Sequence, residues 1–243
     1  MPMLMPYGDL NRVYCAGPLF NEAERNEMTR IAAALQQRGF RTFLPHADGM
    51  EFAKVQPILV GFGYDAPAAG RLLHEAIFAM DTYQVIARCG SLVCNINGRV
   101  PDEGAVAELT MAWMLGKPVV IYKEDVRSMI SGRDNPLVVG QTSFEVVRRL
   151  EDLGPALAAK VAAGRCDGDG PVCLPPHLET IVDLGGRLWR KIESLAMPRA
   201  EERIARIVLE VFAGRRVLGG GEETFRGMPW TAPFSAPASG GGS

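Results

Sequence analysis

Short runs of apolar residues that do not alternate with polar ones recur along the chain, and helical periodicity follows most of them. The runs cover residues 13–17, 40–45, 91–96 and 118–122. Strands of this kind are buried on both faces, as in a parallel sheet that helices cover on either side. The pattern predicts an α/β fold with a doubly wound parallel sheet, flavodoxin-like or Rossmann-like, and a ligand site at the carboxyl ends of the strands.

The segments between these runs supply the predicted helices. Asn21 is a suitable N-cap for a helix whose apolar residues recur at helical spacing and which ends at Gly39. Residues 48–70 are rich in Gly, Pro and aromatic side chains, which predicts a loop or lid. Further helices are predicted over residues 71–89, 103–115, 143–163, 177–195 and 199–212.

The composition shows no bias towards a polyanionic partner. Lys and Arg number 26 against 28 Asp and Glu, a net charge of -2, so nothing indicates binding to nucleic acid or to an anionic membrane. No stretch reaches the roughly 18 apolar residues of a membrane span, and no secretory signal is visible at the start. The five cysteines are few and scattered, as is typical of reduced thiols. We therefore expect a soluble, cytoplasmic protein.

Glu108 is the most informative residue, because the segment from Ala105 to Leu115 carries no other charge. A helix this apolar is expected to be buried or nearly so, and burying an unpaired carboxylate is costly. The Glu108 side chain leans toward the N-terminus of its helix, where Gly104 leaves the space open. The alternative is a structural glutamate that pairs with an arginine or faces solvent.

Two further acids accompany Glu108. Asp102 lies in the loop before the predicted helix, where it is also a suitable N-cap. Asp81 lies among apolar neighbours of the preceding helix. The alternative to a functional role is that Asp81 simply faces solvent from this helix. Carboxylates that converge on one cleft are typical of glycosyl chemistry, in which one attacks the anomeric carbon and another manages a proton.

The ordered motifs of residues 12–125 resemble those of the nucleoside 2-deoxyribosyltransferase family. The most specific segment is Pro101–Glu108, and no single motif is specific alone. The others are Tyr14–Phe20 after the first strand, Phe43–Pro45 with Asp48 and Gly49 after the second, Asp81, and Leu115–Pro118.

The resemblance implies a double displacement in which Glu108 is the nucleophile and forms a covalent 2-deoxyribosyl-enzyme. It implies that Tyr14 hydrogen-bonds and orients this glutamate, and that Asp81 protonates the departing base. Nucleosides and nucleobases are then the ligands, in a homo-oligomer whose active sites are shared between subunits, and no cofactor is implied. The implied substrate-binding residues are Phe20, His46, Asp48, Asp102, Gly104 and, from a neighbouring subunit, Asn135.

Three regions are predicted on this basis. Residues 1–150 form the nucleoside 2-deoxyribosyltransferase-like catalytic domain. Residues 151–214 form a C-terminal helical extension that is a candidate oligomer interface. Residues 215–243 form a Gly/Pro-rich mobile tail.

Other functions remain open at this stage. A nucleoside or nucleoside 5′-monophosphate N-glycosidase would use water in place of the second base, but Asp102 and Glu103 would repel a phosphate. A non-catalytic nucleoside sensor is a further alternative, since Thr110 and Met111 replace the glycine and tyrosine that family members usually carry. No metal site is predicted, because the spacing of Cys166, Cys173 and His177 fits no common zinc site.

Overall fold

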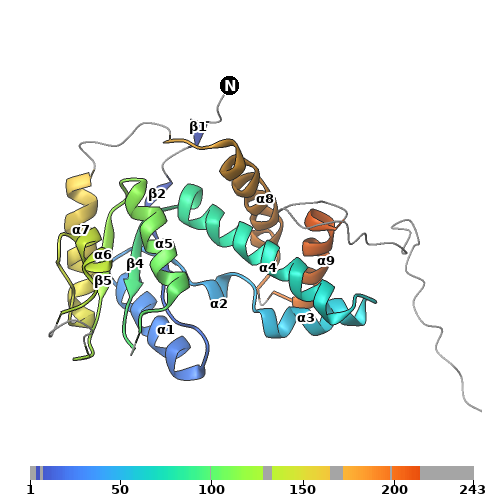
Figure 1. Ribbon diagram of the computed structural model, residues 1–243, viewed down its shortest axis with the longest axis horizontal. Coiled ribbons are helices and arrows are strands. Elements are labelled where there is room, and N and C mark those ends of the chain that lie inside the picture. Colours follow the sequence, from blue (N-terminus) through green and yellow to red (C-terminus); the bar gives the residue numbers. More distant parts are fainter. Residues whose placement is uncertain are drawn as a thin grey trace, which may run out of the picture. The chain divides into compact units, whose positions relative to one another are not determined.

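The computed structural model describes residues 4–5, 8–98, 100–127, 133–164, 172–197 and 199–213. Within them, the central sheet has four parallel strands in the order β3-β2-β4-β5. Val147 forms a parallel bridge with Tyr122 of β5, at the place where a fifth strand would continue the sheet. This strand order is that of flavodoxin-like proteins, so the predicted fold class is confirmed (Figure 1). The strands are β2 (Asp9–Ala16), β3 (Arg41–Phe43), β4 (Cys89–Asn95) and β5 (Val119–Tyr122).

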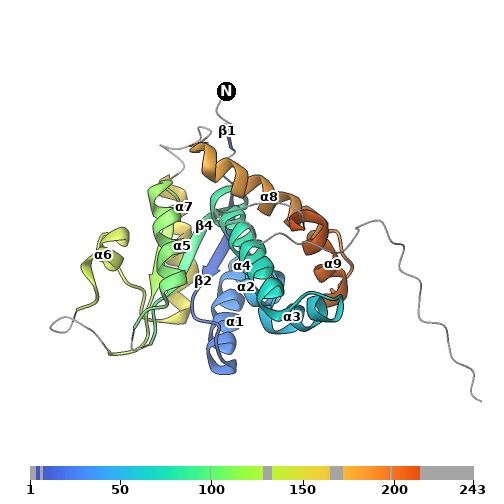
Figure 2. The ribbon, with the colours of Figure 1, turned by 45° about the vertical axis from the view of Figure 1, so that its right-hand side comes forward.

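Helices cover both faces of this sheet, as its uninterrupted apolar strands predict. Val13 and Cys15 of β2 pack against α1 and α7, whereas Tyr14 points to the other face, toward α5. The three helices are labelled in Figures 1 and 2. The described helices are α1 (Glu22–Gln36), α2 (Pro45–Asp48), α3 (Phe52–Gly61), α4 (Ala66–Tyr83), α5 (Glu103–Met114), α6 (Pro136–Val139), α7 (Leu153–Gly164), α8 (Pro176–Glu193) and α9 (Glu201–Phe212).

The carboxyl ends of β2 and β4 form the topological switch point of the sheet. These strands are neighbours, but the chain leaves β2 toward α1 and β3, and leaves β4 toward α5 and β5. Because the two connections diverge to opposite faces, a crevice opens between the loops that follow the two strands. Both loops carry residues of the predicted site.

The prediction of a loop over residues 48–70 is wrong. This stretch contains the whole of α3 and the first turn of α4. Val55 and Leu59, four residues apart, are fully buried and give α3 its packed face. Asp65 caps α4 by accepting a hydrogen bond from the N–H of Ala68 over 2.6 Å. The Pro and Gly residues do not prevent helix formation here, and a proline in the first turn, such as Pro67, favours a helix start.

The helix predicted over residues 143–163 begins ten residues later than expected, at Leu153. Ser143 and Phe144 both adopt left-handed backbone angles, with φ of 56° and 66°, which no helix accommodates. Val147 then pairs with β5, and a short 3-10 turn over Leu150–Asp152 leads into α7. Pairing of Val147 with the edge strand β5 therefore outweighs the helical propensity of this segment.

The C-terminal helices α8 and α9 pack within the chain, against α3 and α4 (Figures 1 and 2). Gly185 of α8 makes the closest approach, since a Cβ atom there would lie 1.9 Å from the carbonyl oxygen of Ala79 in α4. A two-stranded ribbon of β1 (Leu4–Met5) and β6 (Val172–Cys173) lies ahead of α8. Residues 215–243 of the predicted tail lie outside the described residues, and none of the described helices has the length and apolar character to cross a membrane.

Candidate active site

The switch point brings Tyr14 and Glu108 together. Tyr14 is fully buried near the carboxyl end of β2, and Glu108 lies in the second turn of α5, which follows β4. The hydroxyl of Tyr14 donates a hydrogen bond to Oε1 of Glu108 over 2.6 Å. The contact that the resemblance implied is therefore present. It fixes one carboxylate oxygen and leaves Oε2 of Glu108 for a ligand.

The surroundings of Glu108 oppose its ionisation. Burial raises the pKa of its carboxyl well above the usual range, the nearby Asp81 raises it further, and the hydrogen bond from Tyr14 lowers it. Burial and the same two carboxyls raise the pKa of Tyr14 well above 10, so its hydroxyl remains a donor at neutral pH. Glu108 still keeps part of its surface exposed, and a ligand can therefore reach it.

Asp81 shares this environment from the last turn of α4. Its Oδ1 atom is buried and has no hydrogen-bond partner among the described residues. Burial raises the pKa of Asp81 to about 7. Two neighbouring carboxyls of this kind share one proton near neutral pH, because ionising both is costly. Of the two carboxyls, Glu108 is the one that accepts the hydrogen bond from Tyr14, which stabilises its charged form.

Asp102 and Gly104 form the start of the helix that carries Glu108. Asp102 caps α5, because its Oδ2 accepts a hydrogen bond from the N–H of Ala105 over 2.7 Å. The N-cap interpretation of Asp102 is thus confirmed, and its other oxygen is not used by the cap. Gly104 is exposed, and a Cβ atom there would meet only Oδ2 of Asp102, at 3.1 Å. The absence of a side chain keeps the space next to Asp102 open.

Three further residues expected to bind substrate lie after β2 and β3, Phe20 in the loop before α1 and His46 and Asp48 in α2. Phe20 is 80% exposed, and its N–H donates to Oε2 of Glu24 over 2.8 Å. Nδ1 of His46 is buried without a hydrogen-bond partner among the described residues, and burial lowers the pKa of His46, so the ring is neutral at pH 7. Asp48 accepts the N–H of Leu44 over 2.8 Å, a local contact that shapes this turn.

Asn135 occupies a different place. It caps α6 by accepting the N–H of Leu137 over 3.0 Å, and its side chain is exposed. No hydrogen bond among the described residues joins it to Tyr14, Asp81 or Glu108. Within one chain, Asn135 therefore does not belong to the group that these three residues form.

A cavity of about 620 Å³ lies at the same edge of the sheet, on the side of α1 and β5. None of Tyr14, Asp81 and Glu108 lines it. None of the residues that line this cavity was predicted from the sequence to bind substrate. They are Pro18, Asn21, Ala23, Glu24, Asn26, Glu27, Arg30, Asn97, Gly98, Glu124, Asp125 and Arg127.

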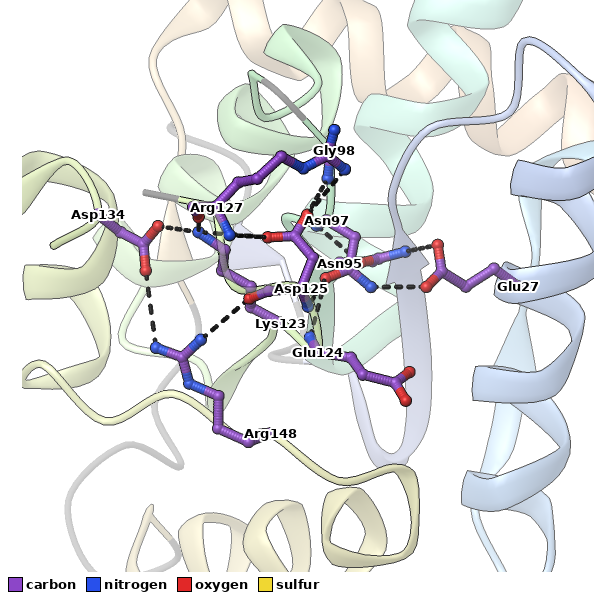
Figure 3. Close-up of polar contacts among 10 residues, drawn as sticks. All are labelled: Glu27, Asn95, Asn97, Gly98, Lys123, Glu124, Asp125, Arg127, Asp134 and Arg148. Carbon is purple, nitrogen blue, oxygen red and sulfur yellow. Dashed lines mark hydrogen bonds and ion pairs between the residues drawn. The ribbon is translucent and has the colours of Figure 1, made fainter. Parts of the chain in front are cut away.

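A polar network next to this cavity joins the loops after β4 and β5 (Figure 3). Glu27 of α1 accepts hydrogen bonds from Asn95 over 3.0 Å and from Asn97 over 2.6 Å. Asn97 in turn accepts the backbone N–H of Asp125 over 3.1 Å, and Asp125 accepts that of Gly98 over 2.7 Å. The network holds Asn97 and Gly98, where the chain leaves β4. The sequence signal for this network is the pair of asparagines at the end of a buried strand, Asn95 as its last residue and Asn97 just after it.

Buried Lys123 extends this network beyond β5. Its ammonium group pairs with Asp134 and donates to the carbonyl oxygen of Arg127, and Asp125 lies 3.7 Å from it. The described residues contain no group of three or more His, Cys, Asp or Glu side chains placed to bind a metal. The sequence predicted no zinc site at Cys166, Cys173 and His177, and this expectation is not tested, because Cys166 and the side chain of Cys173 lie outside the described residues.

Comparison with known proteins assigns the family. The family model described as nucleoside 2-deoxyribosyltransferase matches residues 13–167, which is more than half of the chain. The chain belongs to this family. The matched range of this nucleoside 2-deoxyribosyltransferase family member includes the four residues Tyr14, Asp81, Asp102 and Glu108. The match ends before α8 and α9, so the family assignment says nothing about these two helices.

The other comparisons are less informative. A crystal structure of a conserved protein from Enterococcus faecalis V583 is similar, with 22% sequence identity and a TM-score of 0.46. The similarity covers 61% of this chain and 98% of that one. No curated protein matches the chain.

Proposed function

We propose that the protein transfers a 2-deoxyribosyl group between nucleobases by double displacement through Glu108. The hydrogen bond between Tyr14 and Glu108, with Asp81 close enough to raise the pKa of both, is the observation that carries this proposal. A structural glutamate would be expected to pair with a cation. Here a hydroxyl orients the carboxylate, and a second acid competes with it for a proton.

In the first half-reaction, the ionised Glu108 attacks the anomeric carbon of a 2′-deoxynucleoside. The bond between that carbon and the base breaks, and its electron pair goes to the base nitrogen. Asp81, whose pKa is raised to about 7, gives a proton to the departing base. The product is an ester between Glu108 and the sugar.

In the second half-reaction, a different nucleobase attacks the same carbon and displaces Glu108. The attacking base loses its proton to Asp81, which restores the starting protonation state. Two inversions give overall retention of configuration. We propose that Asp102 and the open space at Gly104 receive the sugar, and that Phe20, His46 and Asp48 contact the base.

We further propose that the enzyme works as a homo-oligomer in which a second copy covers α5 and supplies Asn135 to the site. The outer face of α5 supports this. Trp113 and Met114 are 49% and 75% exposed, although the sequence predicts a helix buried on nearly all sides. Between Gly104 and Leu115, Glu108 is the one charged residue, so two such faces can meet about a twofold axis and bury mainly apolar surface.

Chromatography of reaction products tests the transfer. The protein is incubated with a 2′-deoxynucleoside in the presence and absence of a different free base, beside Glu108→Ala and Glu108→Gln. We expect a new deoxynucleoside that requires the acceptor base and is absent with both variants. Release of free base without exchange would instead indicate a hydrolase, and the corresponding 5′-monophosphate is then the next substrate to test. Saturable nucleoside binding with no turnover would indicate a sensor.

Mixing of inactive variants tests the shared site. Glu108→Ala and Asn135→Ala are each expected to be inactive or severely impaired alone. After they are mixed and allowed to exchange subunits, hybrid sites with Glu108 from one copy and Asn135 from another should restore activity. A monomer in sedimentation velocity, or no restoration despite exchange, would contradict this part of the proposal.

A further inference from the structure

We infer that α8, which lies beyond the region matched by the family, positions the catalytic pair, and that Trp189 is the residue through which it does so. This inference rests on the proposed function of Glu108. It gives the C-terminal extension a role in the active site of its own chain, in addition to any role at an interface.

A continuous series of ring contacts connects Trp189 to Glu108. The edge of the Trp189 ring meets Phe43, with centroids 5.3 Å apart and planes at 79°. Phe43 stacks on Tyr14, with centroids 5.4 Å apart and planes at 29°. The Tyr14 hydroxyl then holds Glu108 over 2.6 Å. The three aromatic residues are at most 2% exposed, so each ring has little freedom to move unless its neighbour moves.

The sheet alone does not provide this support. Tyr14 and Phe43 are register partners on β2 and β3, and β3 is the edge strand of the sheet. The side of Phe43 that Tyr14 leaves uncovered is therefore closed by a helix, and Trp189 of α8 is the ring that closes it. Removal of the indole would let Phe43 tilt away and would loosen the plane of Tyr14.

The same helix also supports Asp81. Gly185 of α8 packs against the backbone of Ala79 and against Tyr83, where a Cβ atom would lie 1.9 Å and 2.7 Å from atoms of these residues. Ala79 and Tyr83 flank Asp81 on α4. One helix therefore supports both neighbours of Glu108, Tyr14 through Trp189 and Asp81 through Gly185.

The contacts of the Trp189 indole indicate more than the filling of space in the core. Nε1 of Trp189 is buried without a hydrogen-bond partner among the described residues, a cost that a phenylalanine would avoid. The ring instead serves as a platform for two cations. The guanidinium carbons of Arg12 and Arg199 lie 5.8 Å and 5.4 Å from its centroid. Arg199 also donates to the carbonyl oxygen of Asp48 over 2.6 Å, which joins the extension to the proposed base side.

A titration of Glu108 by carbon-13 NMR tests the inference. Its side-chain carboxyl resonance is assigned by its disappearance in Glu108→Gln. The ionisable groups that act on Glu108 are Tyr14 from β2, Asp81 from α4 and Asp102 from its own helix, and Cys94 faces it from β4. Trp189→Leu changes none of these and alters no charge. A shift in the titration must therefore come from a change in position.

We expect Trp189→Leu to move the Glu108 titration to higher pH, since the Tyr14 hydrogen bond that lowers this pKa is weakened. The value of kcat should fall roughly 5- to 10-fold, the size expected for one lost aromatic contact. Trp189→Phe keeps a ring edge against Phe43 and should return both quantities toward the wild type. If Trp189→Leu does not fold, Phe43→Leu breaks the same series of contacts and takes its place.

Phe212→Leu is the matched control. Phe212 is a buried aromatic residue of the same extension, 1% exposed, and makes no ring contact with Tyr14, Phe43 or Trp189 among the described residues. This variant should lose stability but leave the Glu108 titration unchanged. An unshifted titration in folded Trp189→Leu, or an equal shift in Phe212→Leu, would overturn the inference. The titration needs no turnover, so a wild-type protein without transferase activity would contradict the proposed function and leave this result intact.

Discussion

Tyr14 and Glu108 are 94 positions apart in the chain, yet the hydroxyl of one lies 2.6 Å from the carboxylate of the other. The contact joins the end of β2 to the helix that follows β4, and these strands are neighbours in the sheet although α1, β3 and α4 separate them in sequence. The fold therefore brings these two residues together at its switch point, where the loops after β2 and β4 diverge.

Tyr14→Phe should retain the fold and lose most of the activity. The phenyl ring keeps the stack on Phe43, but a hydrogen bond to a charged group is lost, which is worth about 1.5–3 kcal/mol. We expect kcat to fall about 10- to 100-fold. The acidic limb of the pH–rate profile should also move to higher pH, because the hydrogen bond no longer lowers the pKa of Glu108. Steady-state kinetics across the pH range measure both effects, and an unchanged acidic limb would argue against Tyr14 as the orienting residue.

Asp81 should govern the alkaline limb of the same profile. Its pKa of about 7 means that the proton needed by the leaving base is lost as the pH rises above neutrality. Asp81→Asn removes this limb and lowers the rate with ordinary nucleosides. A substrate with an activated leaving group, which departs without protonation, should be affected much less. Equal losses with both substrates would contradict a role in protonation.

Asp81 should also reduce stability in a defined pH window. Its folded-state pKa is raised from 3.8 to about 7, so between these values the unfolded chain is ionised while the folded protein holds the proton. The stability of the fold therefore falls as the pH rises through this window. We expect Asp81→Asn to be more stable than the wild type by about 1–3 kcal/mol at pH 8, and nearly equal to it at pH 4. Urea unfolding at the two pH values measures this, and a greater advantage at pH 4 would show the opposite sign.

Lys117 should stabilise the end of the helix that carries Asp81. Its buried ammonium donates to the carbonyl oxygens of Val85 and Ile86, each over 2.8 Å, and of Cys89 over 2.5 Å. These carbonyls belong to the π-turn over Gln84–Arg88, which continues α4, and to the start of β4. Lys117→Met leaves them without this donor, and we expect a loss of about 2–3 kcal/mol in the free energy of unfolding. Arg148→Met, at a half-exposed ion pair, serves as the control and should cost under about 1 kcal/mol.

Most of the fold could be predicted from local patterns, because the strands at the centre of the sheet are uninterrupted apolar runs. The failures have specific causes. Residues 48–70 contain α3 despite their Gly and Pro content, since Val55 and Leu59 place an apolar stripe on that helix. Residues 143–152 form no α-helix, because the pairing of Val147 with β5 and two left-handed residues are set by tertiary contacts.

The candidate site could be predicted as far as residues that follow strands or stand out in apolar segments. Glu108 is conspicuous as a lone charge, and Asp102 as an N-cap. The support from Trp189 could not be predicted, because it depends on how α8 packs against α4. Trp189 also lies about 80 residues from Glu108 in the sequence. The network around Glu27 and Asn97 was missed for the same reason, since its members come from three separate loops and helices.

The central claim is a covalent ester between Glu108 and the sugar. Mass spectrometry of the intact protein, quenched with acid after mixing with a 2′-deoxynucleoside and no acceptor base, tests it most directly. The account predicts an adduct with the mass of one 2-deoxyribosyl group, located on the peptide that contains Glu108, absent in Glu108→Gln and removed by addition of a second base. Base exchange that proceeds with Glu108→Gln, or an adduct on another residue, would contradict the account.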